Sequence, residues 1–283
     1  MTVPNRVGVL GGGRMGAGIA HAFTAAGAAV VVVERDDDAA AAAYQRVSQA
    51  LAKSVERGTT AEPLAALTAR LSVSTDYASF AGCGLVVEAV PEDFELKSTA
   101  LTAVEEQLSP GAWLATNTSS LSVAGLAAVL RRPERFCGLH FFNPVPASLL
   151  VEIVLAEKTC AELERAALGW VEAIGKTPVV VHDAPGFASS RLGVAIALEA
   201  MRMVEEGVAS AEDIDAAMVL GYKHPVGPLR TTDIVGLDVR LGIAEYLYST
   251  LGERFAPPQI LRDKVARGEL GRKSGQGFFD WNG

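Results

Sequence analysis

A histidine and a glutamate in the middle of the chain have the residue types of a general-base pair. His140 and Glu152 each lie within an apolar, strand-like run. If residues 136–142 and 149–155 form an antiparallel hairpin centred on Pro146, residue 140 falls opposite residue 152. A carboxylate beside an imidazole fixes its tautomer and stabilises its protonated form. The spacing therefore predicts a base that takes a hydroxyl proton while a hydride leaves for a nicotinamide.

A second group of residues, near the N-terminus, has the spacing of a phosphate-binding turn. Gly11, Gly13 and Gly16 stand as G-x-G-x-x-G between a β-branched run and a helical pattern. One glycine makes the tight turn, one lets the backbone approach a pyrophosphate, and one lets helix and strand pack closely. The motif alone is a weak signal in a chain with 28 glycines, so the prediction depends on its place between strand and helix.

The residues around this turn extend the predicted dinucleotide site. Arg14 and Met15 lie between the second and third glycines, and Glu34 ends the second expected strand. A carboxylate there can accept hydrogen bonds from the adenosine ribose hydroxyls and would repel a 2′-phosphate. Glu34 therefore favours NAD over NADP, although Arg35 beside it could receive that phosphate. A glycine-rich turn with a solvated Glu34 is the alternative.

The elements that position these groups are predicted to form an α/β fold. The expected strands cover residues 7–10, 30–33, 71–73, 85–90, 113–116, 136–142 and 149–155. Continuous apolar runs such as residues 30–33 are typical of strands buried on both faces. A Rossmann-like, doubly wound domain is therefore expected over residues 1–183. Within it, residues 36–70 predict two helices split at residues 58–60, which protrude as an arm.

A second domain is predicted from residue 184. A turn-rich break follows residues 179–181, and the strand signal then disappears. Helical patterns cover residues 187–206, 211–220, 229–251 and 258–267, with a helix-start box at Ser210. Residues 184–283 are thus expected to form an all-helical dimerisation domain. A homodimer is predicted because the helices of this domain carry more apolar surface than a domain of this size can bury alone. The apolar side chains are Leu192, Val194, Ile196, Leu198, Met201, Ile234, Val235, Leu237, Leu241, Ile243 and Leu247.

Composition and charge exclude several classes of function. The chain has 283 residues, 25 Lys and Arg against 33 Asp and Glu, and no long basic run, so nucleic acid is not an expected partner. No apolar run approaches the ~18 residues of a membrane span. The N-terminus has no signal-peptide pattern, which predicts a cytoplasmic protein. The three cysteines and four histidines lack the spacing of a disulfide framework or a metal site.

Six ordered motifs run along the chain, at residues 11–23, 86–89, 117–121, 140–146, 185–187 and 271–278. Together they closely resemble the motifs of the 3-hydroxyacyl-CoA dehydrogenases, including the bacterial 3-hydroxybutyryl-CoA type. The resemblance extends from residue 6 to residue 281. It implies a Rossmann-like domain, a helical domain that makes a homodimer, and the reversible NAD-dependent oxidation of an L-3-hydroxyacyl thioester.

The same resemblance implies roles for individual residues. His140 is the expected base, Glu152 its orienting partner, and Ser119 the hydroxyl that bonds the substrate's 3-oxygen. Positions near the nicotinamide and its ribose are matched by Glu92, Lys97, Asn143 and Lys273, with Ser119 and Asn143 facing both cofactor and substrate. The alternatives are a first-turn helix pair for Glu92 and Lys97, and a solvated loop cation for Lys273.

The sequence departs from the family pattern at the acyl end of the expected site. Ser190 stands where the family has an asparagine that helps bind and polarise the acyl group, and a hydroxyl has a shorter reach and no second donor. Residues 147–150 and Arg230 also depart from the pattern. The acyl pocket is therefore expected to be reshaped.

The carrier of the acyl group stays open at this point. Arg46, Lys53 and Arg57 fall on one face of the first arm helix. Such a stripe fits the phosphates of coenzyme A, the acidic helix of an acyl carrier protein, or plain solvent. A dehydrogenase of free hydroxy acids is disfavoured because residues 187–206 contain no lysine. A non-catalytic NAD-binding protein is a further alternative, which the intact set of Ser119, His140 and Glu152 disfavours.

Overall fold

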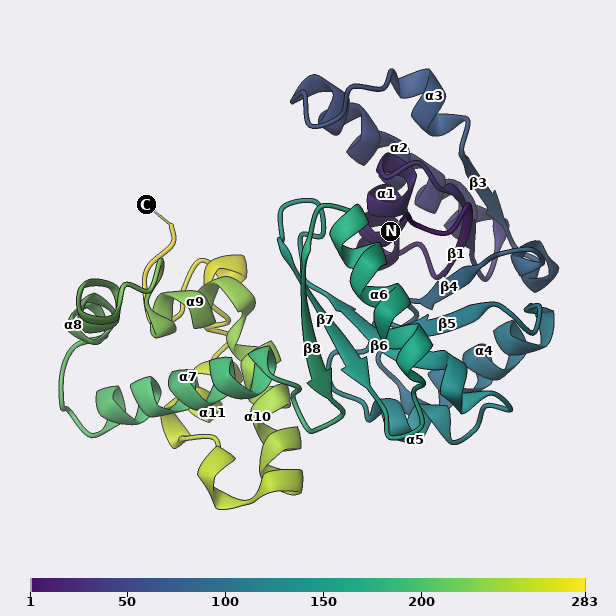
Figure 1. Ribbon diagram of the computed structural model, residues 1–283. Coiled ribbons are helices and arrows are strands. Elements are labelled where there is room, and N and C mark those ends of the chain that lie inside the picture. The colour runs from purple at the N-terminus through teal and green to yellow at the C-terminus, as the bar shows by residue number, and fades with distance from the viewer. Residues whose placement is uncertain (1, 283) are drawn as a thin grey trace. The chain divides into compact units, whose positions relative to one another are not determined.

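One eight-stranded sheet forms the framework of the N-terminal part of the chain (Figure 1). In this computed structural model, which describes residues 2–282, the strand order is β3-β2-β1-β4-β5-β6-β7-β8. The strands are β1 (Arg6–Leu10), β2 (Ala29–Val33), β3 (Leu71–Ser74), β4 (Leu85–Glu88), β5 (Trp113–Thr116), β6 (Phe136–Phe141), β7 (Leu150–Leu155) and β8 (Thr177–His182). All neighbours run parallel except β6 and β7, which confirms the predicted Rossmann-like class.

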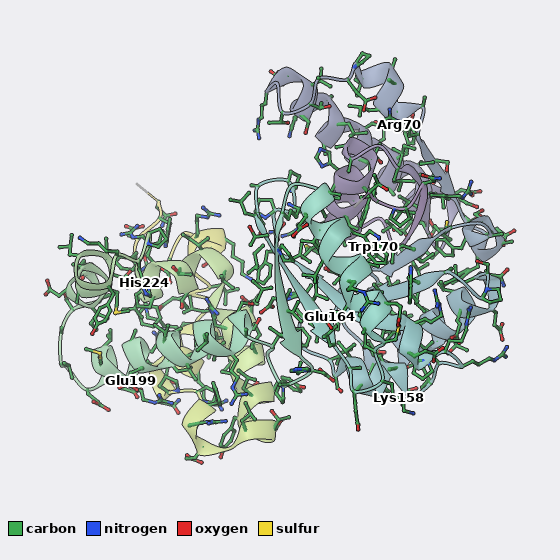
Figure 2. All side chains as sticks on the ribbon, viewed as in Figure 1. Arg70, Lys158, Glu164, Trp170, Glu199 and His224 are labelled. Carbon is green, nitrogen blue, oxygen red and sulfur yellow. The ribbon has the colours of Figure 1, made fainter. Side chains whose placement is uncertain are left out.

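Helices connect the strands and cover both faces of the sheet. They are α1 (Arg14–Ala25), α2 (Asp37–Glu56), α3 (Leu64–Thr68), α4 (Phe94–Gln107), α5 (Val123–Ala127) and α6 (Ala161–Ala173). Residues of α1, α2 and α6 share one core with Leu139 of β6, and Trp170 of α6 (Figure 2) belongs to it. On the other face, a Cβ on Gly138 of β6 would lie 3.1 Å from Val123 of α5. Strands β1, β2 and β4 to β7 are thus largely buried, as their apolar runs indicate, whereas the edge strand β8 is exposed or half-buried.

The excursion between β2 and β3 is anchored by the apolar face of its first helix. Ala43 and Leu51 of α2 are fully buried in the same core as α1. His21 of α1 places its Nε2 atom 2.8 Å from the Ser54 hydroxyl of α2. The predicted break is confirmed at Gly58, whose φ is 67°. The apolar face of α2 fixes this helix against α1 for most of its length.

The chain divides into two compact units, which we call unit 1 (Met1–Asp183) and unit 2 (Ala184–Gly283). Unit 2 contains α7 (Ser189–Glu205), α8 (Ala211–Ala216), a π-helical turn over Ala217–Gly221, α9 (Pro228–Val235), α10 (Leu237–Leu251) and α11 (Gln259–Ala266). Ser210 caps α8 by accepting the N–H of Asp213, as the helix-start box predicts.

Two expectations for unit 2 are corrected. A single helix over residues 229–251 is wrong, because Gly236 separates α9 from α10 with a φ of 110°, which residues with a Cβ rarely adopt. The apolar surface is also smaller than expected. Its own core buries five of the side chains counted as surplus, namely Val194, Leu198, Met201, Leu237 and Leu247.

One buried carboxylate fixes the C-terminal segment of unit 2. Asp233 of α9 accepts hydrogen bonds from the N–H groups of Phe278 and Phe279 and from Nε1 of Trp281, each at 2.9 Å. Gly277 passes so close that a Cβ there would lie 2.3 Å from the Asp233 carboxylate. Asp233 therefore determines the path of residues 271–281, which include Lys273.

None of the helices described within residues 2–282 is both long and apolar enough to cross a membrane. Over the same residues, no three His, Cys, Asp or Glu side chains are grouped so as to hold a metal ion. The cysteines are unpaired thiols, and Cys83 and Cys137 are buried. Burial raises the pKa of the Cys137 thiol to about 12, so this thiol is unreactive.

Candidate active site

The antiparallel hairpin of β6 and β7 brings His140 and Glu152 together in the predicted register. The two residues are direct cross-strand partners, and Nδ1 of His140 lies 2.7 Å from Oε2 of Glu152. Their exposed fractions are 5% and 1%. Cys137 and Leu139 point into the core beside α1, so strand alternation directs His140 to the opposite face. The carboxylate favours the tautomer with its proton on Nδ1, which leaves proton transfer to Nε2.

A turn after β5 presents Ser119, and Glu92 holds this turn. Oε1 of Glu92 accepts hydrogen bonds from the Ser119 N–H at 2.7 Å, the Ser120 N–H at 2.9 Å and the Thr118 hydroxyl at 2.7 Å. Burial raises the pKa of Glu92, but the Lys97 ammonium and these donors outweigh it and hold the pKa below its usual 4.5. Glu92 is therefore a carboxylate at neutral pH, and it orders the Ser119 backbone.

Asn117 joins this turn to the histidine strand, a role that the sequence motif alone did not reveal. Its Oδ1 accepts the N–H of Phe141 at 2.9 Å, next to His140 in β6. Its own N–H donates to the carbonyl of Glu88 at 2.8 Å. The available signal was an amide side chain directly after an apolar strand. Through Asn117, the Ser119 turn and the His140 strand have a fixed separation.

The glycine-rich turn fits the pyrophosphate of a dinucleotide. A Cβ on Gly16 would lie 1.7 Å from the carbonyl oxygen of Gly11, so helix and strand pack as closely as the motif implies. No described heavy atom lies within 4 Å of a Cβ built on Gly13, so this backbone stays open to a ligand. Within the described chain, α1 has no side-chain cap and no acid in its first turn. Its N–H groups are thus left for an anion.

The other residues of this predicted site surround the turn. Arg14 is exposed, and Met15 packs against the core of unit 1. Glu34 accepts the N–H of Gly12 at 2.7 Å, which places its carboxylate beside the turn. Arg35 instead donates from its Nε to Asp36 at 2.9 Å in an exposed ion pair. This arrangement favours Glu34 as the residue that contacts the adenosine ribose.

Lys97 lies inside a buried network, 1% exposed. Its Nζ donates to Glu88 Oε1 at 2.6 Å and to the Val90 carbonyl at 3.0 Å, and Glu92 Oε2 is 3.4 Å away. Lys97 and Glu92 thus contact each other, but Glu92 precedes α4, whose N-cap is Asp93, so they are not a pair within the first turn of a helix. Sequence reasoning assigned no role to Glu88, although an acid at the end of an apolar strand was a visible signal.

A cleft of about 740 Å³ opens between α1, α2 and the loop after β6. Its cationic lining consists of Arg14, Arg46, Lys53, Arg57 and Lys176, so the predicted stripe on α2 faces one hollow. Among the described lining residues none is acidic, although the chain carries a net charge of −8. Asn143, which is exposed, lines the same cleft. The cleft can therefore bind a polyanionic group.

Two predicted site residues belong to unit 2. Ser190 is half-buried in the first turn of α7. Lys273 places its Nζ 2.6 Å from both carboxylate oxygens of Asp238. Their roles toward substrate and cofactor stay predictions.

Comparisons with known proteins cover nearly the whole chain. Residues 6–184 match the family model of the 3-hydroxyacyl-CoA dehydrogenase NAD binding domain, and residues 186–281 match that of the 3-hydroxyacyl-CoA dehydrogenase C-terminal domain. A probable 3-hydroxybutyryl-CoA dehydrogenase of Deinococcus radiodurans is 39% identical over 277 residues, which is 98% of this chain and 100% of that protein. A 3-hydroxyadipyl-CoA dehydrogenase of Escherichia coli is 38% identical over 97% of this chain and 58% of its own length. The crystal structure of (S)-3-hydroxybutyryl-CoA dehydrogenase from Ralstonia eutropha superposes with a TM-score of 0.94 at 36% identity, covering 99% of this chain and 100% of that one.

Proposed function

Because this chain belongs to the 3-hydroxyacyl-CoA dehydrogenase family, we propose that it interconverts a short-chain L-3-hydroxyacyl-CoA thioester and the corresponding 3-oxoacyl thioester. It is an NAD-dependent oxidoreductase, and its cofactor is NAD. The observation that carries the proposal is the buried His140–Glu152 pair, whose Nδ1 and Oε2 atoms are 2.7 Å apart. Such a pair supplies the base that oxidation of a hydroxyl requires.

The residues divide the reaction as follows. NAD, when bound, supplies the hydride acceptor. Nε2 of His140 takes the proton of the 3-hydroxyl, and Glu152 stabilises the imidazolium that forms. When substrate binds, the Ser119 hydroxyl turns its one proton from Glu92 Oε1, which is 3.2 Å away, to the 3-oxygen, and in the reverse direction His140 returns the proton.

The cofactor would be held by residues of the glycine-rich turn and its surroundings. The N–H groups at the start of α1 and the open backbone at Gly13 would receive the pyrophosphate. Glu34 would accept the ribose hydroxyls. Near the nicotinamide and its ribose we propose Glu92, Lys97 and Asn143, of which Lys97 acts from inside the buried network.

Coenzyme A is the carrier that the basic cleft supports best. Its phosphates are a compact polyanion, and five cationic side chains line the cleft, of which Lys176 already donates to the Val145 and Ser148 carbonyls. Charge-assisted hydrogen bonds of this kind are worth about 1.5–3 kcal/mol each. An acyl carrier protein would use the same cations through an acidic helix, so the two carriers are separated by experiment.

The test follows NADH consumption with acetoacetyl groups on coenzyme A, on pantetheine and on an acyl carrier protein. Lys53→Ala should raise KM for the coenzyme A thioester about tenfold, the equivalent of one lost charge-assisted contact, and leave the pantetheine thioester unchanged. Lys158→Ala, at an exposed lysine of unit 1 outside the cleft (Figure 2), is the control.

Each outcome of this test has one meaning. A KM effect confined to the carrier protein would replace coenzyme A as the proposed carrier. Equal KM values for both variants would identify the stripe as a solvated face. A protein that binds NADH in calorimetry but converts none of the three thioesters would be a non-catalytic NAD-binding protein.

Ser190 is expected to affect how the acyl group of the substrate is bound. A serine in place of the family asparagine removes an amide donor near the acyl oxygen. Ser190→Asn should shift the substrate preference toward the 3-hydroxyacyl-CoA thioesters that are typical of the family. The preference is measured as kcat/KM over a series of acyl lengths. An unchanged series would mean that serine replaces asparagine neutrally.

A further inference from the structure

A buried network of charged and hydroxyl groups lies at the carboxyl end of β4. Glu88, the last residue of this strand, is fully buried. Its Oε1 accepts hydrogen bonds from Lys97 Nζ and the Val90 N–H, and its Oε2 accepts the Thr116 hydroxyl, each at 2.6 Å. Both carboxylate oxygens are therefore bonded, as a buried charge requires.

The Lys97 ammonium group has three protein acceptors for its three donors. Besides Glu88, it contacts the Val90 carbonyl at 3.0 Å and Glu92 Oε2 at 3.4 Å. Lys97 thus joins one fully buried carboxylate to a second that is 34% exposed. Glu88 therefore acts on the site through this ammonium and Glu92, and also through Thr116, whose hydroxyl oxygen accepts the Thr118 N–H at 3.2 Å.

Glu92 transmits the arrangement to the turn that carries Ser119. One of its oxygens faces Lys97, and the other accepts five donors from residues 118–120. These include the Ser119 hydroxyl at 3.2 Å. The orientation of one carboxylate therefore decides where the Ser119 backbone and hydroxyl lie.

We propose that Glu88 is a positioning residue of the dehydrogenase reaction: it fixes Lys97, Lys97 fixes Glu92, and Glu92 holds Ser119. This inference rests on the proposed function, because that function assigns the Ser119 hydroxyl to the substrate's 3-oxygen. A mere stabilising ion pair would not require this chain of contacts to end at a reacting group.

Replacing Glu88 by glutamine tests the idea with little change in shape. The amide oxygen can still accept the Val90 N–H, but the negative charge facing Lys97 is gone. The ammonium then has Glu92 as its one remaining carboxylate partner among the described residues and draws that carboxylate toward itself. Glu92 moves away from the 118–120 turn, and Ser119 loses its fixed position.

The experiment is a double-mutant cycle of Glu88→Gln and Ser119→Ala, with kcat and KM measured for acetoacetyl-CoA and NADH. Glu88→Gln should lower kcat roughly 10- to 100-fold, the range for a displaced reacting group. In the Ser119→Ala background the same substitution should change kcat less than about twofold, because its target is absent.

A matched control separates positioning from lost stability. Glu105, on the same helix as Lys97 and 7% exposed, accepts the backbone N–H groups of Arg131 and Arg132 at 2.8 and 2.9 Å. Glu105→Gln removes a buried charge of the same kind but lies outside the network of Glu88. It should lower the melting temperature and leave kcat unchanged in both backgrounds.

A second variant keeps the proposal testable if Glu88→Gln does not fold. Lys97→Met removes the cation that faces Glu92, so Glu92 is protonated more readily in the variant. Loss of kcat on acidification should then begin at a higher pH than in the wild type. If the loss of kcat on acidification begins at the same pH in Lys97→Met and in the wild type, the proposal is contradicted.

The possible failures can be told apart. An active wild type in which Glu88→Gln and Ser119→Ala act additively would overturn the positioning role alone. A wild type without turnover on any thioester would overturn the proposed function, and this inference with it. Non-additive effects of Glu88→Gln and Ser119→Ala on kcat, together with an unchanged kcat in Glu105→Gln, would support both the proposed function and the positioning role.

Discussion

His140 is the residue on which the proposed chemistry depends most directly. If Nε2 accepts the 3-hydroxyl proton, His140→Ala should lower kcat by ~10²- to 10⁴-fold, as expected for a lost general base. The affinity for NADH, measured by calorimetry, should stay nearly the same, because the imidazole is not expected to hold the cofactor. Glu152→Gln should also be slow, because the imidazolium loses its carboxylate partner. Near-normal turnover of His140→Ala would make the pair merely structural.

Residue types and spacing predicted some contacts of this site and missed others, for a physical reason. The His140–Glu152 contact follows from strand alternation and a short hairpin, which the sequence reveals. The Glu88–Lys97 contact depends on how α4 packs against the end of β4, and no local pattern encodes that packing. Asn117 was missed for the same reason, since its acceptor role involves a strand distant in sequence.

At the scale of single elements, the turn into α1 allows two glycines to be distinguished. Gly13→Ala meets no described atom, so the protein should keep its melting temperature but lose NADH affinity, because the methyl group occupies the approach of the pyrophosphate. Gly16→Ala places a methyl group against the Gly11 carbonyl and should lower both the melting temperature and the NADH affinity. Thermal unfolding and NADH titration of the two variants check this. Equal loss of stability in both would contradict the separation.

The contact between α1 and α2 should make stability depend on pH. Burial, with a smaller contribution from Lys176, lowers the pKa of His21 from its usual 6.5. The unfolded chain therefore binds this proton first as the pH falls. The stabilisation that the folded protein gains by keeping His21 neutral is fully present above pH 6.5, and it is lost as the pH falls toward the lower pKa of His21 in the folded state.

The melting temperature should accordingly fall more steeply between pH 7.5 and 5.5 in the wild type than in His21→Gln. His182→Gln, at an exposed histidine of the same unit, is the control and should retain the wild-type slope. Parallel curves for the wild type and His21→Gln would show that this α1–α2 contact does not carry the effect.

The prediction of whole elements succeeded where the hydrophobic periodicity agrees with the turn residues that bound each element. Every expected strand is present, with ends that differ by at most two residues, because β-branched runs bounded by turns are unambiguous. The single helix over residues 229–251 failed because Gly236 interrupts an apolar pattern that continues on both sides. The burial of Ala43 and Leu51 could not be predicted, because it depends on α1 and not on α2 alone.

At the scale of the whole molecule, the apolar side chains left on unit 2 support the proposal of a homodimer. Leu192 and Ile196 of α7 are 63% and 39% exposed, and Leu220 and Tyr222 are 72% and 77% exposed. Light scattering at micromolar concentration should give about twice the 29.6 kDa of one chain. Leu192→Glu should shift the protein toward the monomer, whereas Val129→Glu, at an exposed position of unit 1, should not. A monomeric wild type would refute the proposal.

The hydrogen bond from Trp281 to Asp233 has a spectroscopic consequence, because it gives unit 2 an ordered indole of its own. The other two tryptophans, Trp113 and Trp170, belong to unit 1. A Trp281→Phe variant would emit from unit 1 alone, and a variant lacking the other two would emit from unit 2. Intrinsic fluorescence can thus report the unfolding of each unit separately. If the two transitions do not coincide, no single free energy of unfolding describes this chain.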